Sequence, residues 1–302
     1  MVMIKRMLCC CLAIACLLGM TACERKDFPV KVGETTIPAL PVRVVSLSPL
    51  TTEMLDAVGA AAHLVGRSQQ CDYPSHAAGQ PSMGTALNPD IDAILEANAS
   101  LVLTALPLES DAMQRLEVHG VTVLCLPAAQ TLEEVKSNYI ALATAMGGAN
   151  QGPGNGERSY AMLWERLQFI ADAVAGETPI AACYLSEVHV PAPSNSVLGE
   201  LLRLAGAQNT AAGETWEQNV QAAMQAQVIF CDAALVEAVL SDAAYADSEA
   251  VRSGRVIGLD SRLWERQGLR LTEVAAQMAA ALHPTCQLPT STENSVAQEE
   301  SK

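Results

Sequence analysis

The sequence predicts an α/β protein of two lobes joined by a long helix. In residues 41–155, short apolar runs alternate with segments of helical spacing, an order typical of βαβ units and a mostly parallel sheet. The alternation resumes after residue 178. The segment in between carries one apolar stripe at helical spacing, made of Tyr160, Leu163, Leu167, Ile170 and Val174. With 302 residues, two domains are expected.

The first 22 residues have the composition of an export signal. Lys5 and Arg6 precede an apolar run that ends at Met20, and small residues lead to Cys23. The run is too short for a membrane span. Because "LLGMTAC" resembles a bacterial lipobox, we expect lipidation of Cys23, a polar tether over residues 23–40, and a protein anchored in the periplasm or at the cell surface. The alternative is a plain signal peptide that leaves a thiol at Cys23.

The charge of the chain excludes some partners. Its net charge is −15, and the leader holds two of the 18 basic residues and none of the 33 acidic ones. The mature chain is therefore even more acidic and is a poor candidate for binding nucleic acid. It also lacks a polybasic segment for anionic lipids, so the lipid on Cys23 would be its only membrane anchor.

Five cysteines follow Cys23. Cys125, Cys183 and Cys231 lie inside apolar, strand-like runs and are expected as small core residues. Cys71 and Cys286 lie in loop-like segments, and the sequence leaves open whether they pair. No C-x-x-C occurs after the leader, which argues against a zinc or redox site built on cysteine.

The N-terminal lobe is predicted over residues 41–155. Its expected strands lie in "VRVVSLS", "HLVGRS", "SLVLTAL" and "VTVLCLP", with helices in "DIDAILEANA" and "DAMQRLEVHG". After the first strand, Ser48 is placed to cap a helix whose first residue is Pro49. This helix start is expected at the carboxyl end of a strand, where open α/β sheets bind ligands.

The second half of the chain begins with an expected loop. "GANQGPGNGE", residues 148–157, is rich in Gly and Asn and predicts a connection between two helices. The interlobe helix is expected over 156–177, and the C-terminal lobe over 178–284, with strands in "PIAACYLSE", "AQVIFCD" and "GRVIGLD". Residues 285–302 lack apolar periodicity and are predicted to be disordered.

Three stretches carry a family resemblance: "RVVSLSPLTTEMLDAVGAAAHLVGRSQQCDYP", "NPDIDAILEANASLVLT" and "SGRVIGLDSRLWERQGLRLTEVAAQMAAALHP". They are similar to class III (cluster A, helical-backbone) substrate-binding proteins of ABC importers for corrinoids, iron siderophores and haem. The resemblance spans about residues 41–284. It implies two three-layer lobes on one rigid helix, a ligand clasped between them, and a monomer that delivers it to a membrane permease with its ATPase. "DYP" is typical of the corrinoid branch; a ferric siderophore or haem is the alternative ligand.

The same resemblance implies site residues. The ligand would contact Ser48, Pro49, Thr51, Asp72, Tyr73, Pro74, Thr104, Trp264 and Arg266. Of these, Tyr73 and Trp264 offer ring faces to a planar ligand, although each is also interpretable as a packing residue. For permease docking, Asp92 stands where the N-lobe of the family carries its acidic residue. On the C-lobe the match falls on Asn219, with Glu217 two residues earlier as a substitute.

Other functions find less support in the sequence. No G-x-S-x-G, H-E-x-x-H or nucleotide-binding glycine motif is present, so we expect no enzyme. A direct metal site would have to draw on His76, His189, Glu187 and Asp72, which is sparse material, so we expect no resident metal or cofactor. An anionic siderophore would need arginines, and Arg67, Arg266 and Arg270 are the candidates.

Overall fold

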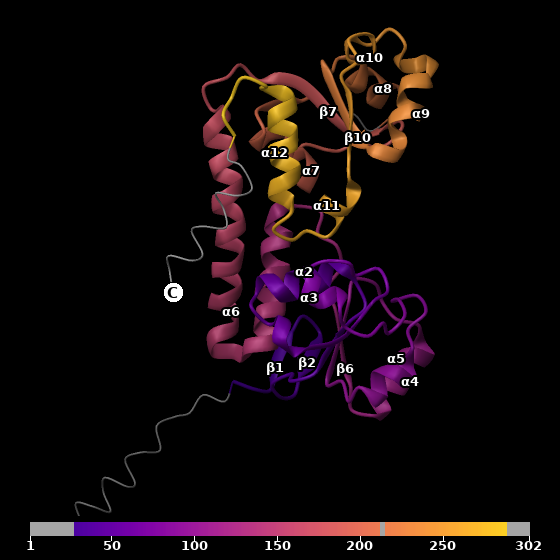
Figure 1. Ribbon diagram of the computed structural model, residues 1–302, viewed down its shortest axis with the longest axis vertical. Coiled ribbons are helices and arrows are strands. Elements are labelled where there is room, and N and C mark those ends of the chain that lie inside the picture. The colour runs from indigo at the N-terminus through magenta and orange to yellow at the C-terminus, as the bar shows by residue number, and fades with distance from the viewer. Residues whose placement is uncertain (1–26, 212–214, 289–302) are drawn as a thin grey trace, which may run out of the picture.

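The computed structural model describes residues 27–211 and 215–288. The expected signal peptide, Cys23 and residues 289–302 of the expected tail lie outside the described residues. Two lobes lie end to end along the helix α6, Leu132–Val174 (Figure 1). The predicted fold class, two α/β lobes with mostly parallel sheets and a long helix between them, is confirmed.

The N-terminal lobe contains one parallel sheet of four strands in the order β4-β3-β5-β6. The strands are β3 Val44–Ser46, β4 Leu64–Arg67, β5 Leu101–Thr104 and β6 Thr122–Cys125. The helices are α2 Pro49–Ala57, η1 Ala61–His63, α3 Ser75–Ala78, α4 Ile91–Glu96 and α5 Ser110–Val118. All four strands lie where the apolar runs predicted them.

Both faces of this sheet are covered, because successive side chains of a strand point to opposite sides. Val44 and Leu101 belong to the cluster formed with α2 and α6. Their neighbours Val45 and Val102 belong to a second cluster with α4 and α5. Strands buried on both faces explain the continuous apolar runs in the sequence.

The C-terminal lobe repeats this plan. Its sheet has the order β11-β10-β7-β8, and β9 also pairs with β7; only the β7–β8 pair is antiparallel. The strands are β7 Ile180–Glu187, β8 Val190–Pro191, β9 Ala207–Asn209, β10 Val228–Asp232 and β11 Val256–Leu259. The helices are α7 Val197–Leu204, α8 Trp216–Met224, η2 Ala233–Leu235, α9 Val236–Ser241, η3 Ala243–Tyr245, α10 Glu249–Arg252, α11 Ser261–Glu265 and α12 Leu271–Leu282.

Part of the segment expected as a tether is folded. β1 Val30–Val32 and β2 Thr35–Ile37 form an antiparallel hairpin that packs against α6 and β6. Val30, Val32 and Ile37 are buried in the large core cluster. The expectation of a free tether over 23–40 is therefore wrong for residues 30–37, where the alternating apolar side chains of a two-stranded ribbon cover the edge of the lobe.

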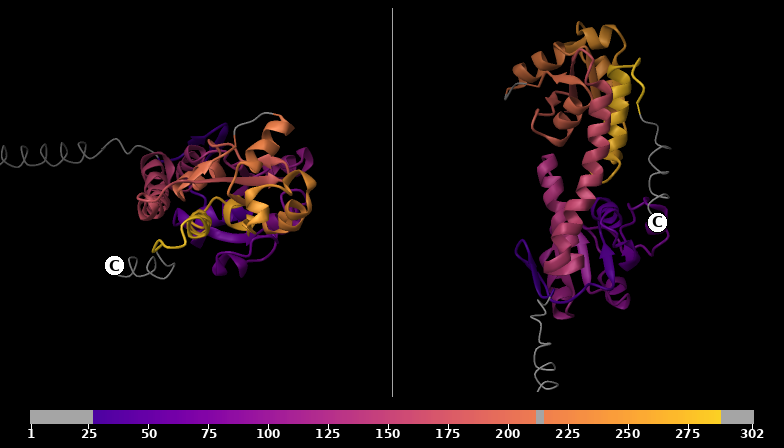
Figure 2. Two further views of the ribbon diagram at one scale, coloured as in Figure 1. Left: turned by 90° about the horizontal axis from the view of Figure 1, so that it is seen from above. Right: turned by 90° about the vertical axis from the view of Figure 1, so that its left-hand side faces the viewer.

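The prediction of a loop over residues 148–157 is also wrong, because this segment is helical apart from Gly148. Gly148, with φ +75°, is the one non-helical residue inside α6, and helix continues on both sides of it. The two halves of α6 lie side by side (Figure 2). A Cβ on Gly152 would lie 2.4 Å from Thr144 Cα, and one on Gly156 would lie 2.4 Å from Ile140 Cα. The glycines allow the two helix backbones to pack in direct contact. The interlobe helix therefore begins near residue 149, and the N-terminal lobe ends there and not at residue 155.

One apolar cluster runs through both lobes. It includes Leu55 and Leu103 of the N-lobe, Leu167 of α6, and Tyr184 and Met278 of the C-lobe. The shared core makes the lobes a single packed unit along α6. Among the residues described here, none of the helices is both long and apolar enough to span a bilayer.

Of the three cysteines predicted as core residues, two are in the core and Cys125 is not. Cys183 and Cys231 are fully buried, and Cys125 is partly exposed. Cys71 and Cys286 are both free thiols; Cys71 touches the Thr52 hydroxyl in the N-lobe, whereas Cys286 lies beside Glu177 at the far end of the C-lobe.

Candidate functional site

A pocket of about 300 Å³ lies between the lobes. The N-lobe contributes residues 128–130, which join β6 to α6. The C-lobe contributes Ser186 near the end of β7, residues 192–193 and 196–198 around the start of α7, and Trp264, Glu265 and Gln267. Its position beyond the carboxyl end of β7 agrees with the usual place of ligands in α/β sheets.

Trp264 forms one wall of this pocket and is held in place. Its indole N–H donates to the Tyr184 hydroxyl at 3.0 Å, and the two rings meet edge to face with centroids 6.0 Å apart. The hydrogen bond and the ring contact together fix the orientation of the indole. Burial raises the pKa of Tyr184, so its hydroxyl stays protonated. A fixed indole at a pocket wall is suited to contact a flat apolar ligand.

The lobes are clamped together beside the pocket by charged side chains. Glu53 of α2, whose side chain is only 3% exposed, accepts from Arg266 at 3.1 Å and from Arg270 at 2.5 Å. We call Glu53, Arg266 and Arg270 the interlobe clamp. Gln267, between the two arginines, exchanges two hydrogen bonds of 2.7 Å with the backbone of Ala129.

Asp72 and Tyr73, both expected at the ligand, lie at the outer edge of the clamp. The Asp72 carboxylate accepts from Arg266, and this hydrogen bond lowers its pKa. The exposed ring of Tyr73 lies under the Arg270 guanidinium, 4.6 Å from the ring centroid. Arg266 therefore joins two carboxylates across the lobes and does not line the pocket.

The first helix starts at Pro49 as the sequence predicted, but Ser48 occupies the N-cap position without making a side-chain capping hydrogen bond. Its hydroxyl groups, however, point inward. Thr51 is fully buried, and its hydroxyl lies 2.7 Å from Ser46 Oγ, while Thr52 bonds both Ser46 and the Ser48 carbonyl. The structure thus uses these side chains to fix the strand-to-helix turn, which leaves the Thr51 hydroxyl no access to a ligand.

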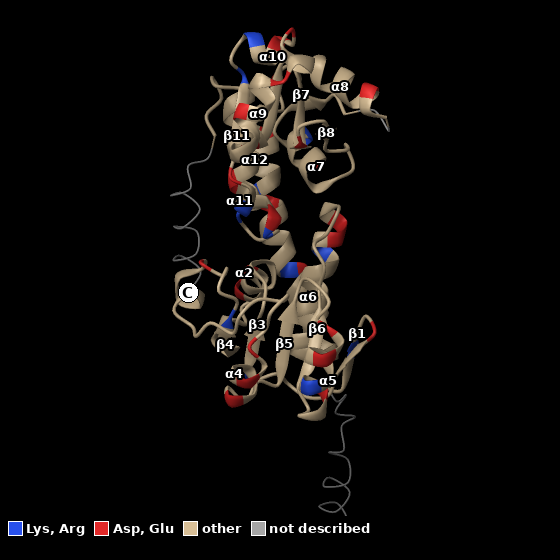
Figure 3. Cartoon of the chain, turned by 90° about the vertical axis from the view of Figure 1, so that its right-hand side faces the viewer, with Lys and Arg blue, Asp and Glu red and all other residues tan. Residues whose placement is uncertain are grey.

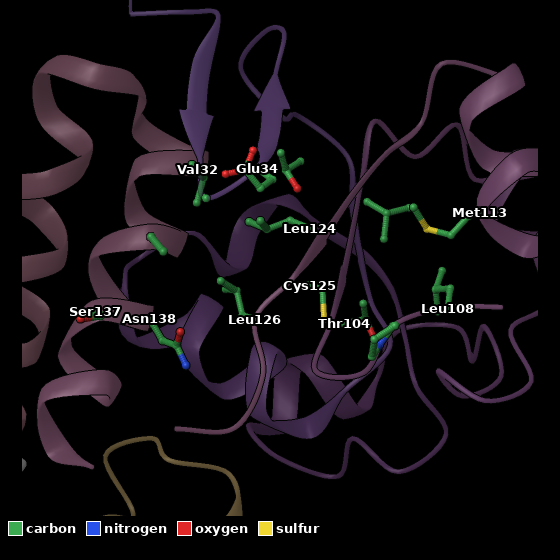
Figure 4. A pocket seen from close by; sticks show the side chains of 15 residues that line it. Val32, Glu34, Thr104, Leu108, Met113, Leu124, Cys125, Leu126, Ser137 and Asn138 are labelled. Atoms are coloured by element: carbon green, nitrogen blue, oxygen red, sulfur yellow. The ribbon is translucent and has the colours of Figure 1, made fainter. Parts of the chain in front are cut away.

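Thr104 lies in a different pocket. Its hydroxyl closes a local turn by donating to the Leu106 carbonyl at 2.7 Å. The pocket beside it, of about 530 Å³, lies at the β6 edge between the β1–β2 hairpin and α6 (Figure 4). Pro74, expected near the ligand, is the buried residue before α3 and lines neither pocket.

The expected docking residues lie on opposite lobes. Asp92 is an exposed residue in the first turn of α4 and pairs with Arg115 at 2.5 Å. Glu217 is exposed in the first turn of α8, and Asn219, further along that helix, is half-buried. Figure 3 shows acidic residues on both α4 and α8.

The remaining histidine and arginine candidates have local partners. His76 lies 3.4 Å from Asp56, and His189 lies 3.1 Å from Asp242. Across the part of the chain that the structure describes, no three His, Cys, Asp or Glu side chains converge as a metal site would require. The Arg67 guanidinium donates to the carbonyls of Ala78 and Ser68 inside its own lobe.

Two interlobe residues escaped the sequence analysis. Glu53 lies next to the apolar stripe of the first helix, between Leu50 and Met54, and an acid in that position was a signal for a buried ion pair. Gln267 gave no signal, because its role depends on a positive φ of 49° and on a backbone partner 138 residues away.

A family model described as "Periplasmic binding protein" matches residues 44–263. YvrC of Bacillus subtilis, an uncharacterized ABC transporter substrate-binding lipoprotein, is 26% identical over 276 residues, which is 85% of this chain and 86% of the relative. A cobalamin-binding protein of Halobacterium salinarum is 24% identical over 274 residues, covering 83% and 72%. A periplasmic heme binding protein from Pseudomonas aeruginosa has the same fold, with a TM-score of 0.65 at 24% identity, covering 84% and 96%.

Proposed function

The chain belongs to the periplasmic binding protein family of ABC importer components, and we propose that the ligand it captures between its lobes is a corrinoid. The observation that carries this proposal is the position of Trp264, fixed by Tyr184 at the wall of the interlobe pocket. The similarity to a cobalamin-binding protein over most of the chain supports it. After capture, the protein would deliver its ligand to a membrane permease.

The volume of the pocket limits how the ligand is taken up. About 300 Å³ is at the lower end of the range for ligand sites, roughly 300–1,000 Å³. A corrin macrocycle would need the lobes to move apart where Gln267 meets the Ala129 backbone. The clamp on one side of the pocket would then act as the pivot, since its buried ion pairs are more costly to break than two neutral hydrogen bonds.

The proposal extends to the membrane. Cys23 would carry a lipid that anchors the mature protein, and residues 24–29 would link the lipid to the hairpin. Asp92 and Glu217, exposed on opposite lobes, would meet cationic side chains of the permease, with Asn219 beside Glu217. Such rim charges guide orientation and association rate more than they add affinity.

Calorimetric titration tests the ligand assignment. The soluble chain, residues 24–302, which lacks the signal and Cys23, is titrated with cyanocobalamin, cobinamide, haemin and a ferric hydroxamate. We expect one-to-one binding of the corrinoids, with affinity lowered at least tenfold by Trp264→Ala. Trp216→Phe is the matched control, because Trp216 is 55% exposed and lies outside the pocket. Binding of haemin or the hydroxamate alone would refute the corrinoid assignment and leave the importer role intact.

Haem is the second candidate ligand, and a specific observation favours it. Arg262, Arg266 and Arg270 lie on one short segment beside the pocket, and cations suit the carboxylates of haem. An anionic ferric siderophore would draw on the same arginines.

A further inference from the structure

Every arginine beside the interlobe pocket is already neutralised by a carboxylate. Arg262 pairs with Asp260 at 2.7 Å and lies 3.7 Å from Asp72. Arg266 bonds Glu53 and Asp72, and Arg270 bonds Glu53 with both its Nε and Nη2. The positive charge that the segment 262–270 brings to the cleft is therefore matched by acidic side chains from both lobes.

An anionic ligand would have to compete with a buried carboxylate for these arginines. The side chain of Glu53 is 3% exposed and those of Arg266 and Arg270 are 8% and 16% exposed. If a ligand carboxylate took either arginine, the buried carboxylate of Glu53 would lose a partner. Leaving a buried charge unpaired is strongly unfavourable, so recruitment of the arginines by the ligand is disfavoured.

Glu265 gives the pocket itself a negative charge. It is the one ionisable residue among those that line the pocket. Its side chain is exposed, and within the described ranges no Lys, Arg or His forms an ion pair with it. It follows Trp264 directly in the sequence, and both residues line the same pocket.

We infer that the interlobe pocket selects ligands without negative charge and that Glu265 is the residue that sets this selectivity. The inference rests on the proposed function, since it concerns the ligand of the same pocket. It assigns neutral or cationic macrocycles with amide side chains to this protein and excludes those with free carboxylates. Arg266 and Arg270 then hold the lobes together and do not bind the ligand.

The test uses pairs of ligands that differ in their free carboxylates. The soluble chain is titrated with cyanocobalamin and with its monocarboxylic acid, in which one amide is hydrolysed, and with haemin and haemin dimethyl ester, which lacks both free carboxylates. We expect the member of each pair without free carboxylates to bind more tightly, by about 2.5-fold for one carboxylate at roughly 8 Å across a wet pocket and by about sixfold for two. The ratio should shrink when salt is raised to 1 M.

Variants separate the role of Glu265 from the overall charge. Glu265→Gln should bring the ratio close to one, whereas Glu237→Gln, which removes the same charge from an exposed position on α9, should leave it unchanged. Equal binding of charged and uncharged ligands by the unmodified chain, or an unchanged ratio in Glu265→Gln, overturns the inference and leaves the proposed function standing. Failure of all four ligands to bind refutes the proposed function and the inference with it.

Discussion

Removing the buried carboxylate of the interlobe clamp should destabilise the protein more than any exposed charge change. In Glu53→Gln, Arg266 and Arg270 would share one neutral carbonyl in a site where their side chains are 8% and 16% exposed. Breaking a buried ion pair from one side costs about 3–5 kcal/mol, because the remaining charge stays buried without its partner. Here Arg270 loses its carboxylate, whereas Arg266 keeps Asp72. At roughly 2–4 °C per kcal/mol for a chain of this size, the midpoint should fall by about 6–20 °C.

Thermal and urea unfolding, followed by circular dichroism, measure this effect. Glu34→Gln is the control, because its 3.0 Å pair with Lys31 has a carboxylate that is 98% exposed, and it should leave the midpoint unchanged. Replacing the whole clamp by Glu53→Leu, Arg266→Met and Arg270→Leu should restore much of the stability. An unfolding free energy of Glu53→Gln within 1 kcal/mol of the parent would refute the reasoning, since the clamp would then be open to water in solution.

Three further perturbations test other parts of the structure. Gly156→Ala should lower the unfolding free energy, measured in urea, by about 1–3 kcal/mol, because the new Cβ would meet Ile140 Cα at 2.4 Å. Gly154→Ala, in the same half of the helix, has only a side-chain contact at 3.6 Å and should raise the unfolding free energy by roughly 0.5–1 kcal/mol. Equal effects of the two substitutions would contradict the close helix packing. Burial raises the pKa of all five tyrosines, to about 12 for Tyr160 and Tyr245, so the neutral phenols stabilise the fold below pH 10 and this contribution is lost as pH rises from 10 to 12. At pH 11, Tyr160 and Tyr245 should each have lowered the unfolding free energy, measured in urea, by about 1.4 kcal/mol. Absorbance of their tyrosinate forms at pH 10 with the fold intact would contradict their burial. Asp92→Lys should leave ligand affinity unchanged and reduce ligand-stimulated ATPase activity of the reconstituted permease; unchanged stimulation would remove Asp92 from the docking surface.

The strands were predictable because a strand buried on both faces consists of consecutive apolar residues. Seven apolar runs in the sequence became β3, β4, β5, β6, β7, β10 and β11. The β1–β2 hairpin was missed, since strands of three residues separated by a turn at Gly33 offer too short an alternation to separate them from a linker.

The error at residues 148–157 has a different physical cause. Glycine lowers helix propensity by about 1 kcal/mol relative to alanine, so a cluster of glycines predicts a loop from local energetics alone. Here the loss is offset by contact between two helix backbones, which depends on Ile140 and Thr144 in the preceding half of α6. A contact between residues of two helices cannot be predicted from the residues of the glycine-rich segment alone.

The site was predicted in part. The resemblance implied Trp264 as a ligand contact, and the structure places it at the wall of the interlobe pocket. Asp72, Tyr73 and Arg266, also implied as ligand contacts, lie together at one interlobe edge as parts of the clamp or its neighbours. Thr51 and Thr104 were misplaced because sequence position at a strand end does not say which way a hydroxyl turns. Side-chain direction was set by partners such as Ser46 and the Leu106 carbonyl, both of which satisfy hydroxyls locally.

The interlobe clamp also has a consequence for the order in which the chain folds. Glu53 is separated from Arg266 by 213 residues and from Arg270 by 217. A chain that emerges from its amino end therefore completes the N-lobe long before either arginine arrives. Until then the first helix carries a carboxylate whose burial has no compensation, which favours keeping that helix loose. The first helix is therefore locked only after the segment 266–270 of the C-lobe has been synthesised, so the stability of the N-lobe depends on a part of the chain made much later.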